Sequence, residues 1–104
     1  MLQILKKLFN RGPRADLGAL IANGATIVDV RTPGEYAGGH IRGSINIPLN
    51  TLGSQMGKIK KDKPVITCCA SGMRSGAARS QLLSAGYSEV HNAGSWFNLK
   101  RYEK

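Results

Sequence analysis

The sequence predicts a single α/β domain with a mainly parallel sheet that carries helices on both faces. Short β-branched and apolar runs, typical of buried strands, alternate along the chain with segments that have helix-start and helix-stop signals. This alternation favours parallel pairing, because each helix returns the chain across the sheet. The length of 104 residues suits one domain, which can bury enough apolar surface to fold without a disulfide or a metal.

The first half of the chain contains two predicted helices and two predicted strands. Residues 15–23 place leucine and isoleucine on one helical face and are followed by a glycine that can end the helix. Residues 26–30 (TIVDV) are a β-branched run that predicts a buried strand. Residues 32–35 (TPGE) begin a short helix, because the threonine, proline and glutamate suit a capping box. Residues 44–48 (SINIP) predict a second, short strand.

The second half contains another convincing strand and the clearest helix of the chain. Residues 64–68 (PVITC) predict a buried strand, and residues 74–85 predict a helix that Gly86 ends. Residues 51–57 predict a weak helical turn, and residues 58–63 a solvated basic connection. Residues 89–92 predict a last strand, and residues 95–101 a closing helix.

The charge balance is strongly basic, with 15 Lys and Arg against 6 Asp and Glu, a net charge of +9. Such a charge attracts small anions, nucleic acid or an acidic membrane surface, and it also keeps a small protein in solution. No stretch interleaves basic residues with aromatic ones, and the chain has only one Trp, three Tyr and two Phe. We therefore expect no nucleic-acid partner.

The two cysteines, Cys68 and Cys69, are adjacent in the chain. Neighbouring residues rarely have the geometry to form a disulfide with each other, and no further cysteine is present to pair with either. The chain also lacks the four-ligand spacing of a metal site, so we expect neither a metal nor a cofactor. Two reduced thiols indicate an intracellular, reducing compartment, and we expect the protein in the cytoplasm.

Residues 1–12 are expected to form an amphipathic basic segment that precedes a domain at 13–104. Lysines interrupt the apolar residues of 1–11 (MLQILKKLFNR) too early for a secretory signal, and no segment has membrane-spanning length. The spacing suits a short amphipathic helix, which we expect to pack on its own domain in preference to a membrane.

The stretch with the most chemical information is residues 69–75 (CASGMRS), between a buried strand and a helix. Open α/β sheets place their sites at this end of a strand. The small residues at 70–72 let the backbone curl with its N–H groups pointing inward, which forms an anion-binding nest, and Arg74 adds a permanent positive charge. A thiol beside such a nest ionises readily, so Cys69 is expected to be a thiolate near neutral pH and a soft nucleophile.

This stretch resembles the active-site loop of rhodanese-like domains, in which a cysteine is followed by an arginine five positions later. The resemblance extends over residues 29–48 (DVRTPGEYAGGHIRGSINIP), 63–78 (KPVITCCASGMRSGAA) and 93–96 (AGSW), and so covers most of the chain beyond the first dozen residues. It implies a single rhodanese-like domain with a five-stranded, mainly parallel sheet flanked by helices on both faces.

The resemblance also implies a sulfurtransferase that works by a ping-pong reaction. The Cys69 thiolate takes a sulfane sulfur from a small anionic donor such as thiosulfate, releases sulfite and holds the sulfur as a persulfide. Cyanide, a thiol or a protein acceptor then removes it, and the small domain leaves room for a protein partner. The implied catalytic residues are Cys69 and Arg74. The implied substrate-binding residues are Ala70, Ser71, Gly72, Met73 and Ser75, and the supporting residues are Asp29, Arg31 and Trp96. Either serine is equally suited to a capping role.

A second hypothesis places the nucleophile at Cys68, because Cys68 with Arg74 and Ser75 fits the signature of cysteine-dependent phosphatases and would also suit an arsenate reductase. Strand alternation points the side chains of Cys68 and Cys69 to opposite sides of the sheet. Cys68 continues the strand, whereas Cys69 is the first residue at which the chain can turn into the loop. We therefore favour Cys69, and expect Cys68 to be a small buried hydrophobe in preference to a resolving thiol.

A third hypothesis is a non-enzymatic binding module, since a fold can serve for recognition alone. The thiol inside an anion-binding loop argues against it. Of the supporting residues, Asp29 and Arg31 are expected to hold loops as an ion pair, and Trp96 suits a pocket wall or a core aromatic. His40 and His91 are assigned no catalytic role.

Overall fold

The computed structural model describes residues 16–103, so the predicted segment 1–12 lies outside the described residues. Strands and helices alternate along this part of the chain, as expected. The elements are α2 (Leu17–Ala22), β1 (Thr26–Asp29), α3 (Pro33–Ala37), β2 (Ile45–Asn46), the 3₁₀ turn η1 (Leu49–Thr51), α4 (Leu52–Gln55), η2 (Met56–Lys58), β3 (Val65–Cys69), α5 (Met73–Ser84), β4 (Val90–Ser95) and the 3₁₀ segment η3 (Trp96–Tyr102).

The sheet of residues 16–103 has four strands in the order β2-β1-β3-β4, and every pair is parallel. The expectation of five strands is therefore wrong for this part of the chain. Four extended runs are present in the sequence, and the same four pair in the sheet. The fifth strand was implied by the family resemblance alone, and no further segment of 16–103 is extended and paired.

One strand boundary matters for the site, because β3 continues through Cys69 instead of ending at residue 68. The register between β3 and β4 shifts at Thr67, and Cys69 then pairs with Ser95. The longer β4 supplies this partner. Cys69 is consequently held by the sheet, and the turn into the loop begins one residue later than expected.

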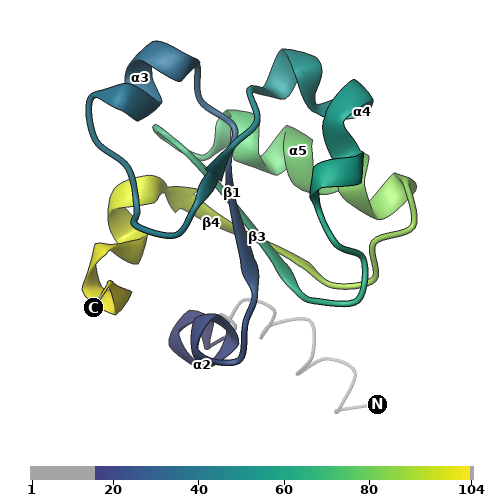
Figure 1. Cartoon of the computed structure of the whole chain (residues 1–104), viewed down its shortest axis with the longest axis horizontal. Coiled ribbons are helices and arrows are strands. Elements are labelled where there is room, and N and C mark those ends of the chain that lie inside the picture. Colours follow the sequence, from purple (N-terminus) through teal and green to yellow (C-terminus); the bar gives the residue numbers. More distant parts are fainter. Residues whose placement is uncertain (1–15, 104) are drawn as a thin grey trace, which may run out of the picture.

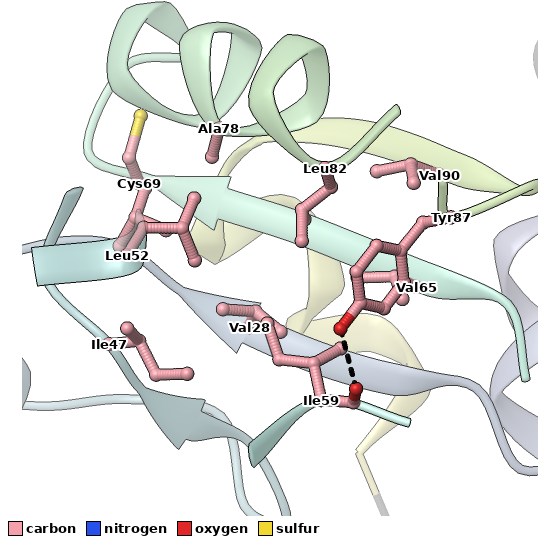
Figure 2. Packing of buried hydrophobic residues seen from close by; sticks show 11 residues of the cluster. Val28, Ile47, Leu52, Ile59, Val65, Cys69, Ala78, Leu82, Tyr87 and Val90 are labelled. Carbon is pink, nitrogen blue, oxygen red and sulfur yellow. Dashed lines mark hydrogen bonds between the residues drawn. The ribbon is translucent and has the colours of Figure 1, made fainter. Parts of the chain in front are cut away.

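Helices cover both faces of the sheet, as predicted (Figure 1). On one face, α5 and α4 enclose a core that contains Val28, Val65, Leu82 and the side chain of Cys69 (Figure 2). The Tyr87 hydroxyl connects this core to the chain before β3, because its oxygen lies 2.7 Å from the carbonyl of residue 59 and 2.9 Å from that of residue 56 and its one proton is shared between them.

The other face carries α2 and η3 over a second core cluster, with Ile27, Ile66, Cys68 and Leu99 buried in it. Cys68 and Cys69 therefore lie on opposite sides of the sheet, as strand alternation predicts. Within residues 16–103, no helix has the length and apolar character needed to cross a membrane.

The local signal that begins α3 is also confirmed. The capping box of α3 is present, with the Thr32 hydroxyl accepting from the Glu35 N–H and the Glu35 carboxylate accepting from the Thr32 N–H. The Asp16 side chain caps α2 in a similar way. These bonds satisfy first-turn N–H groups that a helix leaves without internal partners.

Candidate active site

The loop between β3 and α5 folds back over the sulfur of Cys69. Gly72 precedes α5 with φ of 115°, a left-handed conformation that favours glycine over residues with a side chain. This turn directs the Gly72 N–H at the Cys69 Sγ, 2.9 Å away. Figure 2 shows the same sulfur pointing away from the sheet and toward the helix that covers it.

The Cys69 sulfur has two further partners, both from Ser75 in the first turn of α5. The Ser75 hydroxyl lies 3.2 Å from Sγ, and the Ser75 N–H donates to Sγ at 3.4 Å. Burial raises the pKa of Cys69, but these hydrogen bonds, with those from the Gly72 and Ser71 N–H groups, outweigh burial and leave the pKa lowered. The side chain itself has no exposed surface.

Cys68 has the opposite electrostatic environment on the far face of the sheet. Burial, followed by the nearby Asp29 carboxylate, raises the pKa of Cys68 to about 12. The thiol therefore stays protonated at neutral pH and packs as a small apolar side chain, as the sequence predicts. This geometry does not support a Cys68 nucleophile.

Arg74 points its guanidinium at a carboxylate from another element. It donates to both oxygens of Glu35, at 2.8 and 3.1 Å, and both side chains are partly exposed. The hydrogen bond from Arg74, together with the Thr32 N–H, lowers the pKa of Glu35 to about 2, so the carboxylate is ionised at neutral pH. The role of Arg74 toward a substrate stays a prediction. Glu35 was expected only to cap α3, and its contact with the loop was missed.

Asn92 of β4 is a second residue that sequence reasoning missed. Its side-chain oxygen accepts a hydrogen bond from the Ser75 hydroxyl at 2.6 Å, and that hydroxyl also contacts the Cys69 sulfur. Its position near the carboxyl end of a strand beside β3 is the signal that could have identified it, because parallel strands bring these ends to one edge.

The predicted ion pair between Asp29 and Arg31 is present and buried. The Arg31 Nε lies 2.9 Å from Asp29 Oδ1, and the Arg31 Nη2 lies 2.7 Å from Oδ2. Nη2 also donates to the Gly39 carbonyl at 2.8 Å. The guanidinium lies 4.7 Å from the centre of the Trp96 ring, which packs against the second core cluster. The pair thus links β1 to the loop after α3.

The remaining predicted residues lie away from the sulfur or reach it through the backbone alone. Ala70 and Ser71 are exposed, as is Met73 with 79% of its surface accessible. His40 Nδ1 donates a hydrogen bond to the Tyr36 carbonyl, and His91 contacts Glu89. Among the described residues, no three histidine, cysteine or acidic side chains form a group able to hold a metal.

The family model described as the rhodanese-like domain matches residues 13–101. The chain belongs to the rhodanese-like domain family. The thiosulfate sulfurtransferase GlpE of Stutzerimonas stutzeri is 35% identical over 94 residues, which cover 90% of this chain and 86% of that protein. The uncharacterized protein YqhL of Bacillus subtilis is 44% identical over 68 residues, 65% of this chain and 54% of that protein.

Solved structures of rhodanese-like proteins have the same fold. The human single-domain sulfurtransferase TSTD1 aligns with a TM-score of 0.70 at 28% identity, over 86% of this chain and 93% of that chain. The reduced CoADR-RHD of Bacillus anthracis aligns with a TM-score of 0.71 at 34% identity, over 82% of this chain but 16% of that one. The rhodanese-like chain thus spans about half of YqhL and a small part of CoADR-RHD.

Proposed function

We propose that this rhodanese-like chain is a sulfurtransferase that carries a sulfane sulfur on Cys69 as a persulfide, taken from a small anionic donor such as thiosulfate. The observation that carries the proposal is the set of contacts on the Cys69 sulfur: the N–H groups of Gly72 and Ser75 donate to it, and the Ser75 hydroxyl lies 3.2 Å away. These donors and the positive end of α5 favour the thiolate, which is the nucleophile such chemistry needs.

In the first half-reaction, the Cys69 thiolate attacks the outer sulfur of thiosulfate. A bond forms between Sγ and that sulfur, and the sulfur–sulfur bond of thiosulfate breaks. Its electron pair leaves with sulfite, and the negative charge remains on the outer sulfur of the new persulfide. Because the Cys69 side chain has no exposed surface, the residues that cover Sγ must move before the donor can reach it.

In the second half-reaction, a nucleophile such as cyanide or a thiolate attacks the outer sulfur. The bond from the acceptor to that sulfur forms as the persulfide bond breaks, and the electron pair returns to Sγ as the thiolate. Thiocyanate or a new persulfide leaves, so sulfur is transferred without any external oxidant or reductant. The first-turn N–H groups of α5 stabilise anionic sulfur in both halves.

Three further observations support an anionic donor. The net charge of +9 attracts anions over a distance, and Arg74 stands in the first turn of the helix behind the sulfur. The GlpE relatives carry the name thiosulfate sulfurtransferase. A protein thiol is the acceptor we expect in the cell.

The proposal is tested by the mass of the intact wild-type chain after incubation with thiosulfate, before and after cyanide. We expect a gain of one sulfur atom that cyanide removes as thiocyanate. A chain with a free thiol that never gains sulfur would contradict the proposal with this donor. Release of phosphate from an aryl phosphate would favour the phosphatase instead, and neither reaction would favour a binding module.

Replacing Glu35 by glutamine is expected to lower the KM for thiosulfate by about two- to fivefold at low salt. Glutamine keeps the capping box of α3, but it no longer neutralises Arg74, so the potential beside the loop becomes more positive. The measurement is the KM and kcat of the variant and wild type at low and high ionic strength, where screening should remove most of the difference. A KM that rises would instead show that Glu35 is needed to orient Arg74.

A further inference from the structure

Behind the Cys69 sulfur, two groups compete for the one proton of the Ser75 hydroxyl. Ser75 Oγ lies 2.6 Å from Asn92 Oδ1 and 3.2 Å from Cys69 Sγ. A hydroxyl donates a single hydrogen bond, so it can serve the amide oxygen or the sulfur at one time. The state of the sulfur decides between them, because a thiol can donate to Oγ whereas a thiolate can only accept.

The backbone around Asn92 fixes which atom of its amide faces Ser75. The Gly94 N–H donates to Oδ1 at 2.9 Å, and Nδ2 donates to the Gly72 carbonyl at 3.3 Å. A reversed amide would set a donor against the Gly94 N–H and an acceptor against the Gly72 carbonyl. The atom beside Ser75 is therefore an oxygen, which can accept the hydroxyl proton and has none to give.

We propose that Asn92 is a positioning residue that draws the Ser75 proton away from Cys69, and so favours the thiol and the persulfide over the free thiolate. In the thiol form, Cys69 donates to Ser75 Oγ and Ser75 donates to Asn92. Ionisation releases the thiol proton to solvent and turns the hydroxyl toward the sulfur. Asn92 Oδ1 then keeps only the Gly94 N–H.

The persulfide part of this inference rests on the proposed function. Once Sγ is bonded to a second sulfur, the negative charge lies on the outer atom, and the Ser75 proton can return to Asn92. The hydroxyl would thus turn twice in each catalytic cycle. Asn92 would lower the free energy of the loaded state relative to the free thiolate, which helps a carrier to retain its sulfur.

The charged groups on the elements around Cys69 do not take part in this competition. Arg74 of α5 pairs with Glu35 of α3, and Asp29 pairs with Arg31. Arg79 of α5 donates to the Val90 carbonyl, and His91 of β4 contacts Glu89. The uncharged Cys68 thiol lies on the far face of the sheet. Within residues 16–103, the hydrogen bonds of the Ser75 hydroxyl go to Cys69 and Asn92. A change at Asn92 therefore acts on the sulfur through hydrogen bonds and leaves these charges in place.

The test is the rate of alkylation of Cys69 by iodoacetamide, measured from about pH 4 to about pH 10. The full-length chain carries Cys68→Ala throughout, so that a single thiol reacts and no sulfur donor is needed. The midpoint is the pH at which the alkylation rate reaches half its maximum. We expect Ser75→Ala to raise this midpoint by about 0.5 to 1 pH unit, and Asn92→Ala to lower it by a similar amount. In the double variant the effect of Asn92→Ala should vanish, because the shared proton is gone.

A merely structural role for Asn92 has the opposite signature. Loss of the hydrogen bonds from Asn92 to the loop would weaken the hydrogen bond from the Gly72 N–H to the sulfur, so the midpoint would rise in Asn92→Ala. The same rise would appear when Asn92→Ala is combined with Ser75→Ala, because it would not depend on the Ser75 hydroxyl. A midpoint that rises or stays unchanged in Asn92→Ala overturns the proposal.

A second variant keeps the test decisive if Asn92→Ala fails to fold. Asn92→Asp retains an acceptor and makes it stronger, so we expect the midpoint to rise, and to rise less when Ser75 is alanine. A midpoint that falls in Asn92→Asp overturns the proposal. Both variants report on Cys69 even if thiosulfate proves not to be the donor, so failure here is distinct from failure of the proposed function.

Discussion

Replacement of Cys69 by serine is expected to reduce sulfur transfer from thiosulfate to cyanide by on the order of 10³-fold or more. Serine keeps the shape of the side chain, but its hydroxyl does not ionise near neutral pH and cannot form a persulfide. The N–H groups of Gly72 and Ser75 and the Ser75 hydroxyl stay in place around the new oxygen, so the fold should survive. The measurement is thiocyanate formation, with the melting temperature as evidence of folding.

Cys68→Ala is the matched control, because it removes the neighbouring thiol from the same strand. Cys68 lies on the far face with a pKa raised to about 12 by burial, so its loss should change the rate by less than about threefold. The buried sulfur leaves a small cavity that costs about 1 kcal/mol in unfolding free energy. Full activity in Cys69→Ser with loss in Cys68→Ala would reverse the assignment of the nucleophile.

The fold was largely predictable because its signals are local. The strands β1 and β3 are apolar runs, and α3 has its capping residues within four positions of each other. The opposite facing of Cys68 and Cys69 follows from strand alternation, which needs no knowledge of the rest of the chain. The one-residue extension of β3 was not predictable in this way, since it depends on a register shift against β4.

The sequence predicted the residues of the loop after β3, but it did not predict the residues from other elements that contact them. Cys69, Gly72 and Ser75 lie within seven residues, so the spacing alone suggests that they meet. Arg74 and Glu35 are 39 positions apart, and Ser75 and Asn92 are 17 apart. Such pairs form only when α3, α5 and β4 meet at one edge of the sheet. When a local role already explains a residue, as capping explains Glu35, the sequence does not indicate that the residue has a second, long-range contact.

The buried pair of Asp29 and Arg31 leads to the prediction with the largest effect on stability. Asp29 has no exposed surface and Arg31 has 4%. Removing one member of a buried ion pair leaves an uncompensated charge, so Arg31→Met should lower the free energy of unfolding by about 3 to 5 kcal/mol. For a domain of this size that corresponds to a fall in melting temperature of roughly 10 to 20 °C.

Two controls separate the buried charge from other causes of instability in Arg31→Met. Lys100→Ala removes the cation of the partly exposed pair between Lys100 and Glu103, and it should cost less than about 1 kcal/mol because solvent screens that pair. Combining Arg31→Met with Asp29→Asn removes the orphan carboxylate, so the double variant should unfold at a higher temperature than Arg31→Met alone. A double variant no more stable than the single one would show that the lost contacts of Arg31 with Gly39 and Trp96 dominate. Rescue would show that Arg31 stabilises the domain mainly by neutralising Asp29, which pairs with Cys68 in the sheet next to the loop that follows β3.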